Sequence, residues 1–185
     1  LATNFYNFET LSGVLQAAKS KNRPIILQLS ESSIQYLGLE VAAAMAHEGL
    51  KQYGVEGWLH LDHGSSVDVV HRCLDAGFDS VMIDASEKPF DENVKLTAEV
   101  VRLAGQYNAN VEAELGYIAK LGQANSIQYT QPIEATRFVD ATGVHALAIA
   151  IGSAHGFYKE TPQLQLELLS QIHEATPAAL VLHGS

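Results

Sequence analysis

Three histidines occur in the pairs Asp62-His63, His155-Gly156 and His183-Gly184, at well-separated points of the chain. Each pair comes at the end of a short apolar run that is typical of a buried strand. Catalytic zinc commonly takes three protein ligands and keeps a fourth position for water or substrate. If the three strand ends meet in the fold, these imidazoles predict a catalytic zinc site.

Acidic side chains follow the same pattern. Asp84 ends another apolar run, and Glu112 and Glu114 lie two residues apart in the run 110–115. Residues two apart on a strand share one face, so both glutamates would be buried if that face points inward. Buried carboxylates need a metal, a histidine or a cation as partner. A structural salt bridge in the core explains the pair equally well at this stage.

The segment Gly152-Ser153-Ala154-His155-Gly156, followed by Lys159, has the composition of a small phosphate-binding turn. Glycines allow backbone N–H groups to approach an anion, and a lysine adds positive charge. A glycine-rich turn is also simply a turn, so this signal carries weight only together with the others. Similarly, a single histidine is more often structural than a ligand. We interpret His47, His71 and His173 as ordinary helix residues and His60 as a packed strand residue.

Short apolar runs alternate with helical stretches along the whole chain. The expected strands are 2–5, 25–29, 57–61, 78–83, 110–115, 145–151 and 178–182, and the expected helices are 9–19, 39–53, 66–76, 92–107, 132–142 and 163–175. Such alternation predicts parallel βαβ units, in either a doubly wound sheet or a (β/α)8 TIM barrel. No glycine-rich dinucleotide fingerprint follows the first strand, which disfavours the doubly wound sheet.

We therefore predict one α/β barrel domain over residues 1–185, incomplete, with about seven strands and without the final strand and helix. In this fold the residues that follow the strands meet at the C-terminal face, where barrel active sites occur. That face would collect the histidines and carboxylates named above.

Composition indicates which binding partners and which cellular compartment are compatible with the chain. The formal net charge of −10 argues against non-specific nucleic-acid binding, and no apolar run is long enough to cross a membrane. A phosphorylated small molecule is still compatible with this charge, because backbone amides and one lysine can hold a phosphate. Cys73 is the only cysteine, so an internal disulfide is impossible. This fits a reducing compartment, and we expect a cytoplasmic protein.

Five motifs occur in a specific order: Leu59-His60-Leu61-Asp62-His63, Met82-Ile83-Asp84-Ala85-Ser86, Val111-Glu112-Ala113-Glu114-Leu115-Gly116, Ala150-Ile151-Gly152-Ser153-Ala154-His155-Gly156 and Leu182-His183-Gly184. Together they resemble the class II ketose-bisphosphate aldolases, which include fructose-bisphosphate and tagatose-bisphosphate aldolases. The resemblance runs from about Asn4 to the last residue. It implies a (β/α)8 barrel that reversibly cleaves fructose 1,6-bisphosphate or tagatose 1,6-bisphosphate to dihydroxyacetone phosphate and glyceraldehyde 3-phosphate.

The resemblance also implies roles for individual residues. His63, His155 and His183 match Zn²⁺ ligands, and Asp62 matches the acid/base at the hydroxyl next to the cleaved bond. Substrate and phosphate positions are matched by Asn4, Ser30, Gly156, Lys159 and Gly184, and positions near the metal, in supporting or alternate-metal roles, by Asp84, Glu112 and Glu114. A zinc ion would stabilise the negative charge of the enediolate that cleavage produces. Relatives also commonly bind a monovalent cation and form dimers or tetramers, so we expect a homodimer or homotetramer.

One departure from the family concerns a loop. Relatives usually carry a Gly-Gly-x-Glu-Asp loop after the motif that ends at Gly116, whereas here residues 117–125 contain no acid. The base that exchanges the proton of dihydroxyacetone phosphate is therefore unassigned. Two alternatives stay open: a zinc aldolase of the same fold for another phosphorylated ketose, and a sugar-phosphate-binding barrel without catalysis. The presence of all three histidines and Asp62 argues against the second.

Overall fold

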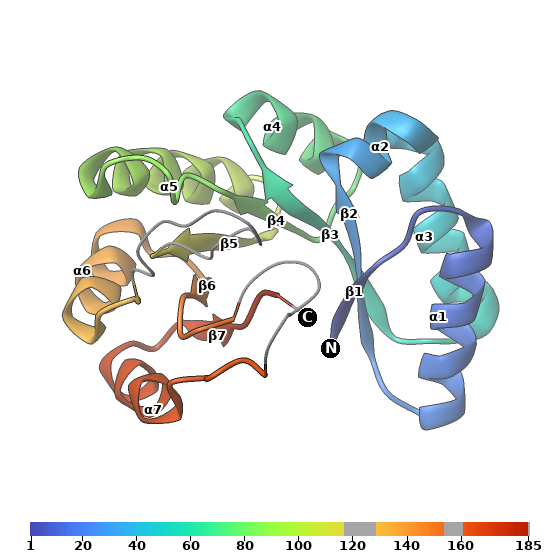
Figure 1. The fold of residues 1–185 in the computed structure, drawn as a ribbon. Coiled ribbons are helices and arrows are strands. Elements are labelled where there is room, and N and C mark those ends of the chain that lie inside the picture. The colour runs from blue at the N-terminus through green and yellow to red at the C-terminus, as the bar shows by residue number, and fades with distance from the viewer. Residues whose placement is uncertain (117–128, 154–160, 185) are drawn as a thin grey trace. The chain divides into compact units, whose positions relative to one another are not determined.

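The structure is a computed structural model that describes residues 1–116, 129–153 and 161–184. It contains two compact units, one formed by Leu1–Ile83 with Leu103–Asn110 and the other by Asp84–Arg102 with Val111–Ser185. Parallel strands alternate with helices in both units (Figure 1). None of the helices in the described ranges is long and apolar enough to span a bilayer.

The first unit contains four strands, β1 (Ala2–Asn4), β2 (Ile25–Ser30), β3 (Gly57–Gly64) and β4 (Ser80–Ile83). Each strand pairs in parallel with the next along the chain. The connecting helices are α1 (Phe8–Lys21), α2 (Glu31–Leu37), α3 (Leu39–Tyr53) and α4 (Val67–Asp75). This order of neighbours brings the C-terminal ends of β1, β2 and β3 to the same edge of the sheet.

The second unit contains β6 (Ala146–Ile149), β7 (Ala179–Val181) and most of β5 (Asn110–Leu115), again paired in parallel and in chain order. Its helices are α6 (Pro132–Thr142), α7 (Leu166–Ala175) and all but the last turn of α5 (Phe90–Gly105). The side chain of Thr136 in α6 donates a hydrogen bond of 2.8 Å to the carbonyl of Ala175, which ties α6 to the end of α7.

Local sequence explains where the elements begin and end. Asn7 caps α1 by accepting a hydrogen bond from the backbone N–H of Thr10, whose hydroxyl accepts in return from the N–H of Asn7. This reciprocal capping box satisfies N–H groups that have no partner inside the helix. Along β2, buried Leu27 and Leu29 alternate with the partly exposed Gln28 and Ser30. The alternation puts the two leucines on one face of the sheet and Gln28 and Ser30 on the other.

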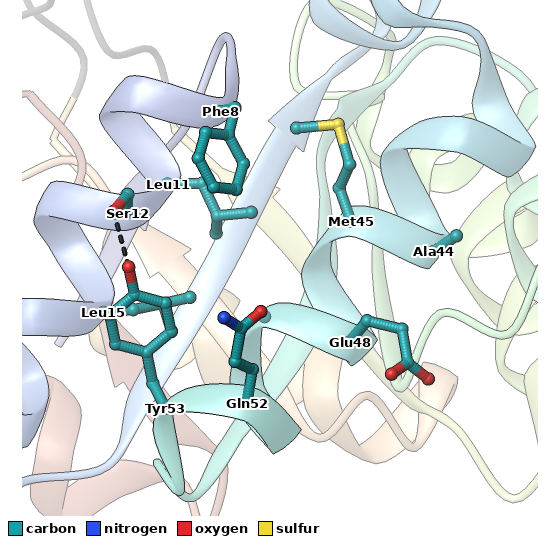
Figure 2. A pocket seen from close by; sticks show the side chains of 10 residues that line it. Phe8, Leu11, Ser12, Leu15, Ala44, Met45, Glu48, Gln52 and Tyr53 are labelled. Carbon is teal, nitrogen blue, oxygen red and sulfur yellow. Dashed lines mark hydrogen bonds between the residues drawn. The ribbon is translucent and has the colours of Figure 1, made fainter.

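Helices α1 and α3 pack side by side in the first unit. Gly49 permits their close approach, because a Cβ atom there would lie 2.8 Å from Cδ1 of Leu15. A cavity of about 340 Å³ remains between the two helices, and Figure 2 shows its mainly apolar lining, which includes Phe8 and Met45. Ser12 and Tyr53 close one side through a hydrogen bond of 2.6 Å between their hydroxyls. None of the predicted site residues that the structure describes lines this cavity.

Several element bounds differ from the sequence prediction by a few residues, and two differences concern the predicted site residues. Helix α2 was not expected, and it places Ser30 and Glu31 at a helix start. The predicted end of the third strand at residue 61 is wrong: β3 continues to Gly64 and includes Asp62 and His63. The strand is longer because Ser30 pairs with Asp62 and Gly64 pairs with Ile83, so neighbouring strands extend the ladder on both sides.

Candidate active site

The first unit gathers three of the predicted residues at the ends of its strands. Asn4 ends β1, Ser30 ends β2, and Ser30 lies opposite Asp62 in the β2–β3 register. The side-chain Nδ2 of Asn4 donates a hydrogen bond of 2.8 Å to Oδ2 of Asp62. This contact spans two strands and fixes the orientation of a partly buried carboxylate.

His63 adopts an unusual backbone conformation beside this carboxylate. Its φ is 51°, in the left-handed region that residues other than glycine rarely occupy. The β3–β4 register shifts between Leu61 and Gly64, which is a bulge. Bulges re-aim side chains and are common next to active sites. The Nε2 atom of His63 lies 3.8 Å from Oδ1 of Asp62, and the His63 side chain is 29% exposed, so it can reach a ligand at the strand end.

The residues around this turn pack tightly. A Cβ atom on Gly64 would lie 2.6 Å from the carbonyl oxygen of Met82, so only glycine fits there without a shift. Ser30 caps α2 by accepting a hydrogen bond of 3.3 Å from the N–H of Ser33. Glu31, the first residue of α2, accepts a hydrogen bond of 2.5 Å from the backbone N–H of Ser65 through its Oε1. Glu31 could not be identified from the sequence, because no motif links it to a residue 34 positions away.

The second unit places His183 against Glu112. The Nε2 of His183 and Oε1 of Glu112 are 2.7 Å apart, and both side chains are less than 10% exposed. A carboxylate on one imidazole nitrogen holds the proton there, so the tautomer keeps the lone pair on Nδ1. This is the form of histidine that binds a metal, and carboxylate–histidine pairs commonly support metal ligands. The pair thus fits the chemistry of a zinc ligand.

Glu114 and Asp84 also lie at strand ends in this unit. Glu114 is buried on β5, and its backbone carbonyl accepts a hydrogen bond of 3.0 Å from the side chain of Asn93 on α5. Asp84 follows β4, and its Oδ1 accepts from both the N–H and the hydroxyl of Ser86, at 3.1 and 2.7 Å. These contacts keep the Asp84 carboxylate oriented directly after the strand.

Thr130 joins the ends of β5 and β6. Its hydroxyl donates to the carbonyl of Leu115 at 2.5 Å, and it accepts from the N–H of Ala150 at 2.9 Å. Gly152, shortly after the end of β6, has a φ of 109°, and a Cβ atom there would lie 2.6 Å from the carbonyl oxygen of Gln163. Gly184 likewise has a positive φ, 88°, directly after His183. The predicted residues His155, Gly156 and Lys159 and the loop 117–125 lie outside the described residues.

Two histidines outside the predicted site, His60 and His145, have structural partners. The Nδ1 atom of buried His60 lies 2.8 Å from the hydroxyl of Ser80, and that of His145 accepts from the N–H of Val111. Burial raises the pKa of the Cys73 thiol to about 12. The thiol is therefore protonated near neutral pH and is unsuited to act as a nucleophile.

The chain is similar in sequence to a known protein family and to a curated member of it. A family profile described as "Fructose-bisphosphate aldolase class-II" matches residues 1–185. A curated fructose-bisphosphate aldolase from Giardia intestinalis is 39% identical over the whole chain. The chain spans 59% of the length of that relative.

Two solved structures are similar to this chain in both sequence and fold. The YdjI aldolase of Escherichia coli K12 is 35% identical, with a TM-score of 0.89 over 100% of this chain and 66% of its own. A proposed fructose-1,6-bisphosphate aldolase from Coccidioides immitis is 34% identical, with a TM-score of 0.90 over 99% of this chain and 67% of its own. The predicted fold class, an incomplete (β/α)8 barrel with seven strands among the described residues, is thereby confirmed.

Proposed function

Because the chain belongs to the family of class-II fructose-bisphosphate aldolases, we propose that the protein reversibly cleaves a carbon–carbon bond in a ketose bisphosphate. The products would be dihydroxyacetone phosphate and glyceraldehyde 3-phosphate. The structural observation that carries most weight is the buried pair of His183 and Glu112, because it has the form of a supported metal ligand.

We assign the metal to His63, His155 and His183. Two observations support the assignment: Oε1 of Glu112 lies 2.7 Å from Nε2 of His183, and a strained, bulged turn presents His63 at the end of β3. Zn²⁺ held by these residues would act as a Lewis acid that stabilises the negative charge developing on the substrate oxygens. Glu114 and Asp84 are proposed to support this region or an alternate metal position.

We assign the proton transfer at the cleaved bond to Asp62. Its carboxylate is held by the amide of Asn4, so an oxygen can accept the proton of the substrate hydroxyl during cleavage and return it during condensation. Asn4 and Ser30 would line the substrate side of the same strand ends. Gly156, Lys159 and Gly184 would bind the phosphate of the dihydroxyacetone phosphate half. A monovalent cation near that phosphate is part of the same proposal.

The substrate is proposed to be fructose 1,6-bisphosphate or tagatose 1,6-bisphosphate. The decisive experiment measures cleavage of a panel of ketose bisphosphates by the full-length protein, before and after chelation and after addition of Zn²⁺. We expect cleavage of one of these two sugars, loss on chelation and recovery with zinc. Cleavage of a different phosphorylated ketose would change the substrate but keep the reaction. Tight binding of a sugar phosphate without turnover would show that the protein is a binding protein and not an enzyme.

Two further properties belong to the proposal. We infer a homodimer or homotetramer, which light scattering on the purified full-length protein would test. We also infer a cytoplasmic location, which fits the single cysteine and can be tested by cell fractionation.

A further inference from the structure

The contact between Glu31 and Ser65 joins two loops at the C-terminal ends of neighbouring strands. Glu31 begins α2 directly after β2, and Ser65 follows the last residue of β3. Their hydrogen bond of 2.5 Å is formed by a side-chain carboxylate oxygen and a backbone N–H. The bond lies at the surface, with Glu31 partly exposed and Ser65 exposed.

Ser65 is two residues from His63, in the same turn. His63 has a φ of 51°, and such a conformation persists only where the surroundings hold it. On one side of the turn, Gly64 packs against the Met82 carbonyl with no room for a Cβ atom. On the other side, Glu31 holds the N–H of Ser65. The turn is therefore held from both the β4 side and the β2 side.

We propose that Glu31 is a positioning residue that holds the His63–Ser65 turn in the conformation required for His63 to bind zinc. The inference rests on the proposed function, in which His63 is a metal ligand. Glu31 acts through the backbone of Ser65 and does not itself contact the metal. Loss of the carboxylate would leave the turn held from one side only. Zinc binding would then have to order the His63 backbone, which lowers the affinity.

The test compares zinc affinity among variants of the full-length protein, by competition with a chromophoric chelator on the metal-free form. Glu31→Ala should weaken zinc binding by about 10-fold, the lower end of what loss of a supporting residue causes. Glu31→Gln keeps an oxygen at the same position and should restore most of the affinity. A role limited to helix stability would move the melting temperature of the metal-free protein without this pattern of rescue.

A matched control is available in the neighbouring helix. Glu40 lies in the first turn of α3, as Glu31 lies in the first turn of α2. Glu40→Ala therefore removes an acidic side chain from an equivalent helix position and should leave zinc affinity unchanged. Equal zinc affinity in wild type and Glu31→Ala, or equal losses in Glu31→Ala and Glu40→Ala, would overturn the proposal.

Failure of the proposed function has a different signature. His63→Ala should abolish tight zinc binding. If wild type binds no zinc, or if His63→Ala binds it as tightly as wild type, the assignment of the metal is wrong and the role of Glu31 falls with it. If His63→Ala loses zinc but Glu31→Ala does not, only the role of Glu31 is refuted.

Discussion

The side-chain amide of Asn4 donates a hydrogen bond to Oδ2 of Asp62, while Oδ1 of the same carboxylate lies 3.8 Å from Nε2 of His63. The two oxygens thus have different neighbours, an amide on β1 and an imidazole on β3. Both of these contacts come from strand residues of the first unit. Mutation of Asp62 tests whether its role differs from that of the proposed metal ligand His63.

Asp62→Asn keeps the size of the side chain and removes the proposed proton acceptor. We expect cleavage to fall by about 10²–10⁴-fold, the usual contribution of one acid–base group. Zinc content, measured by atomic absorption, should be nearly unchanged. Exchange of solvent hydrogen into dihydroxyacetone phosphate should survive better than cleavage, because exchange does not use the aldehyde-side hydroxyl.

Asp68→Asn is the control for this change, because Asp68 is exposed on α4 and pairs only with Arg72 among the described residues. Its variant should retain full cleavage. If Asp62→Asn abolished exchange and cleavage equally with zinc still bound, Asp62 would be the base for the enediolate, and the present division of roles would be wrong.

Glu112→Gln removes the negative charge next to His183. Because the carboxylate holds the imidazole tautomer, we expect zinc affinity to fall by about 10–100-fold, as for other residues that support metal ligands. Chelator competition measures the change. Glu92→Gln, on the exposed side of α5, should have no effect. Identical zinc affinities for the two variants would show that Glu112 does not support a ligand.

Gly64→Ala should destabilise the protein. The added methyl group would lie 2.6 Å from the Met82 carbonyl oxygen and 2.8 Å from Cδ2 of Leu61, so the β3–β4 pair must shift. We expect a loss of about 1–3 kcal/mol in the free energy of unfolding, the usual cost of overpacking. Gly13→Ala is the comparison: among the described residues nothing lies within 4 Å of a Cβ atom there. Gly13→Ala should be as stable as wild type or more stable. Denaturant unfolding measures both variants, and a lower stability of Gly13→Ala than of Gly64→Ala would contradict the prediction.

Cys73 provides a pH-dependent test of the core. Burial raises its pKa from 9.0 to about 12, so the native thiol stays protonated at pH 9 while an unfolded thiol is half ionised. Iodoacetamide should therefore modify Cys73 much more slowly in the native protein than in denaturant. Since the folded pKa is the higher one, this thiol favours the folded state below pH 9, and its contribution is lost as the pH rises from 9 to 12. Cys73→Ala should remove that part of the pH dependence, and rapid alkylation of the native protein at pH 9 would contradict the prediction.

The predicted bounds were most accurate where the hydrophobic periodicity was strong and residues such as glycine marked the end of the element. The bounds of α3, β5 and α6 agree with the expected ranges, and Gly54 and Gly143 end their helices in the left-handed conformation. Helix α2 escaped prediction because its seven residues are too few to show a helical period. The end of β3 was misplaced because strand pairing with β2 and β4, which lies outside the local pattern, extends it.

The candidate site shows the same division. Residue type and position suggested Asp62, His63, Glu112 and His183, because reactive side chains at strand ends stand out in a sequence. Their hydrogen bonds could not be predicted: Asn4 meets Asp62 across 58 positions, and Glu112 meets His183 across 71. Such pairs depend on the strand register, which no short motif encodes. The single-domain organisation over residues 1–185 stays a prediction.

The order of strand pairing has a consequence for how the chain folds during synthesis. Ala2 pairs with Ile26 and Ile25 pairs with Gly57, so each strand needs only the next βα segment to leave the ribosome before it finds its neighbour. At about 5–20 residues per second, translation supplies each new partner within a few seconds. The loops closed in this way are all of similar length, so their entropic costs differ little. Strands β1 to β3 can therefore pair one after another during synthesis. Ribosome-bound chains in which β3 has left the ribosome should already protect the backbone amides of β2 from hydrogen exchange.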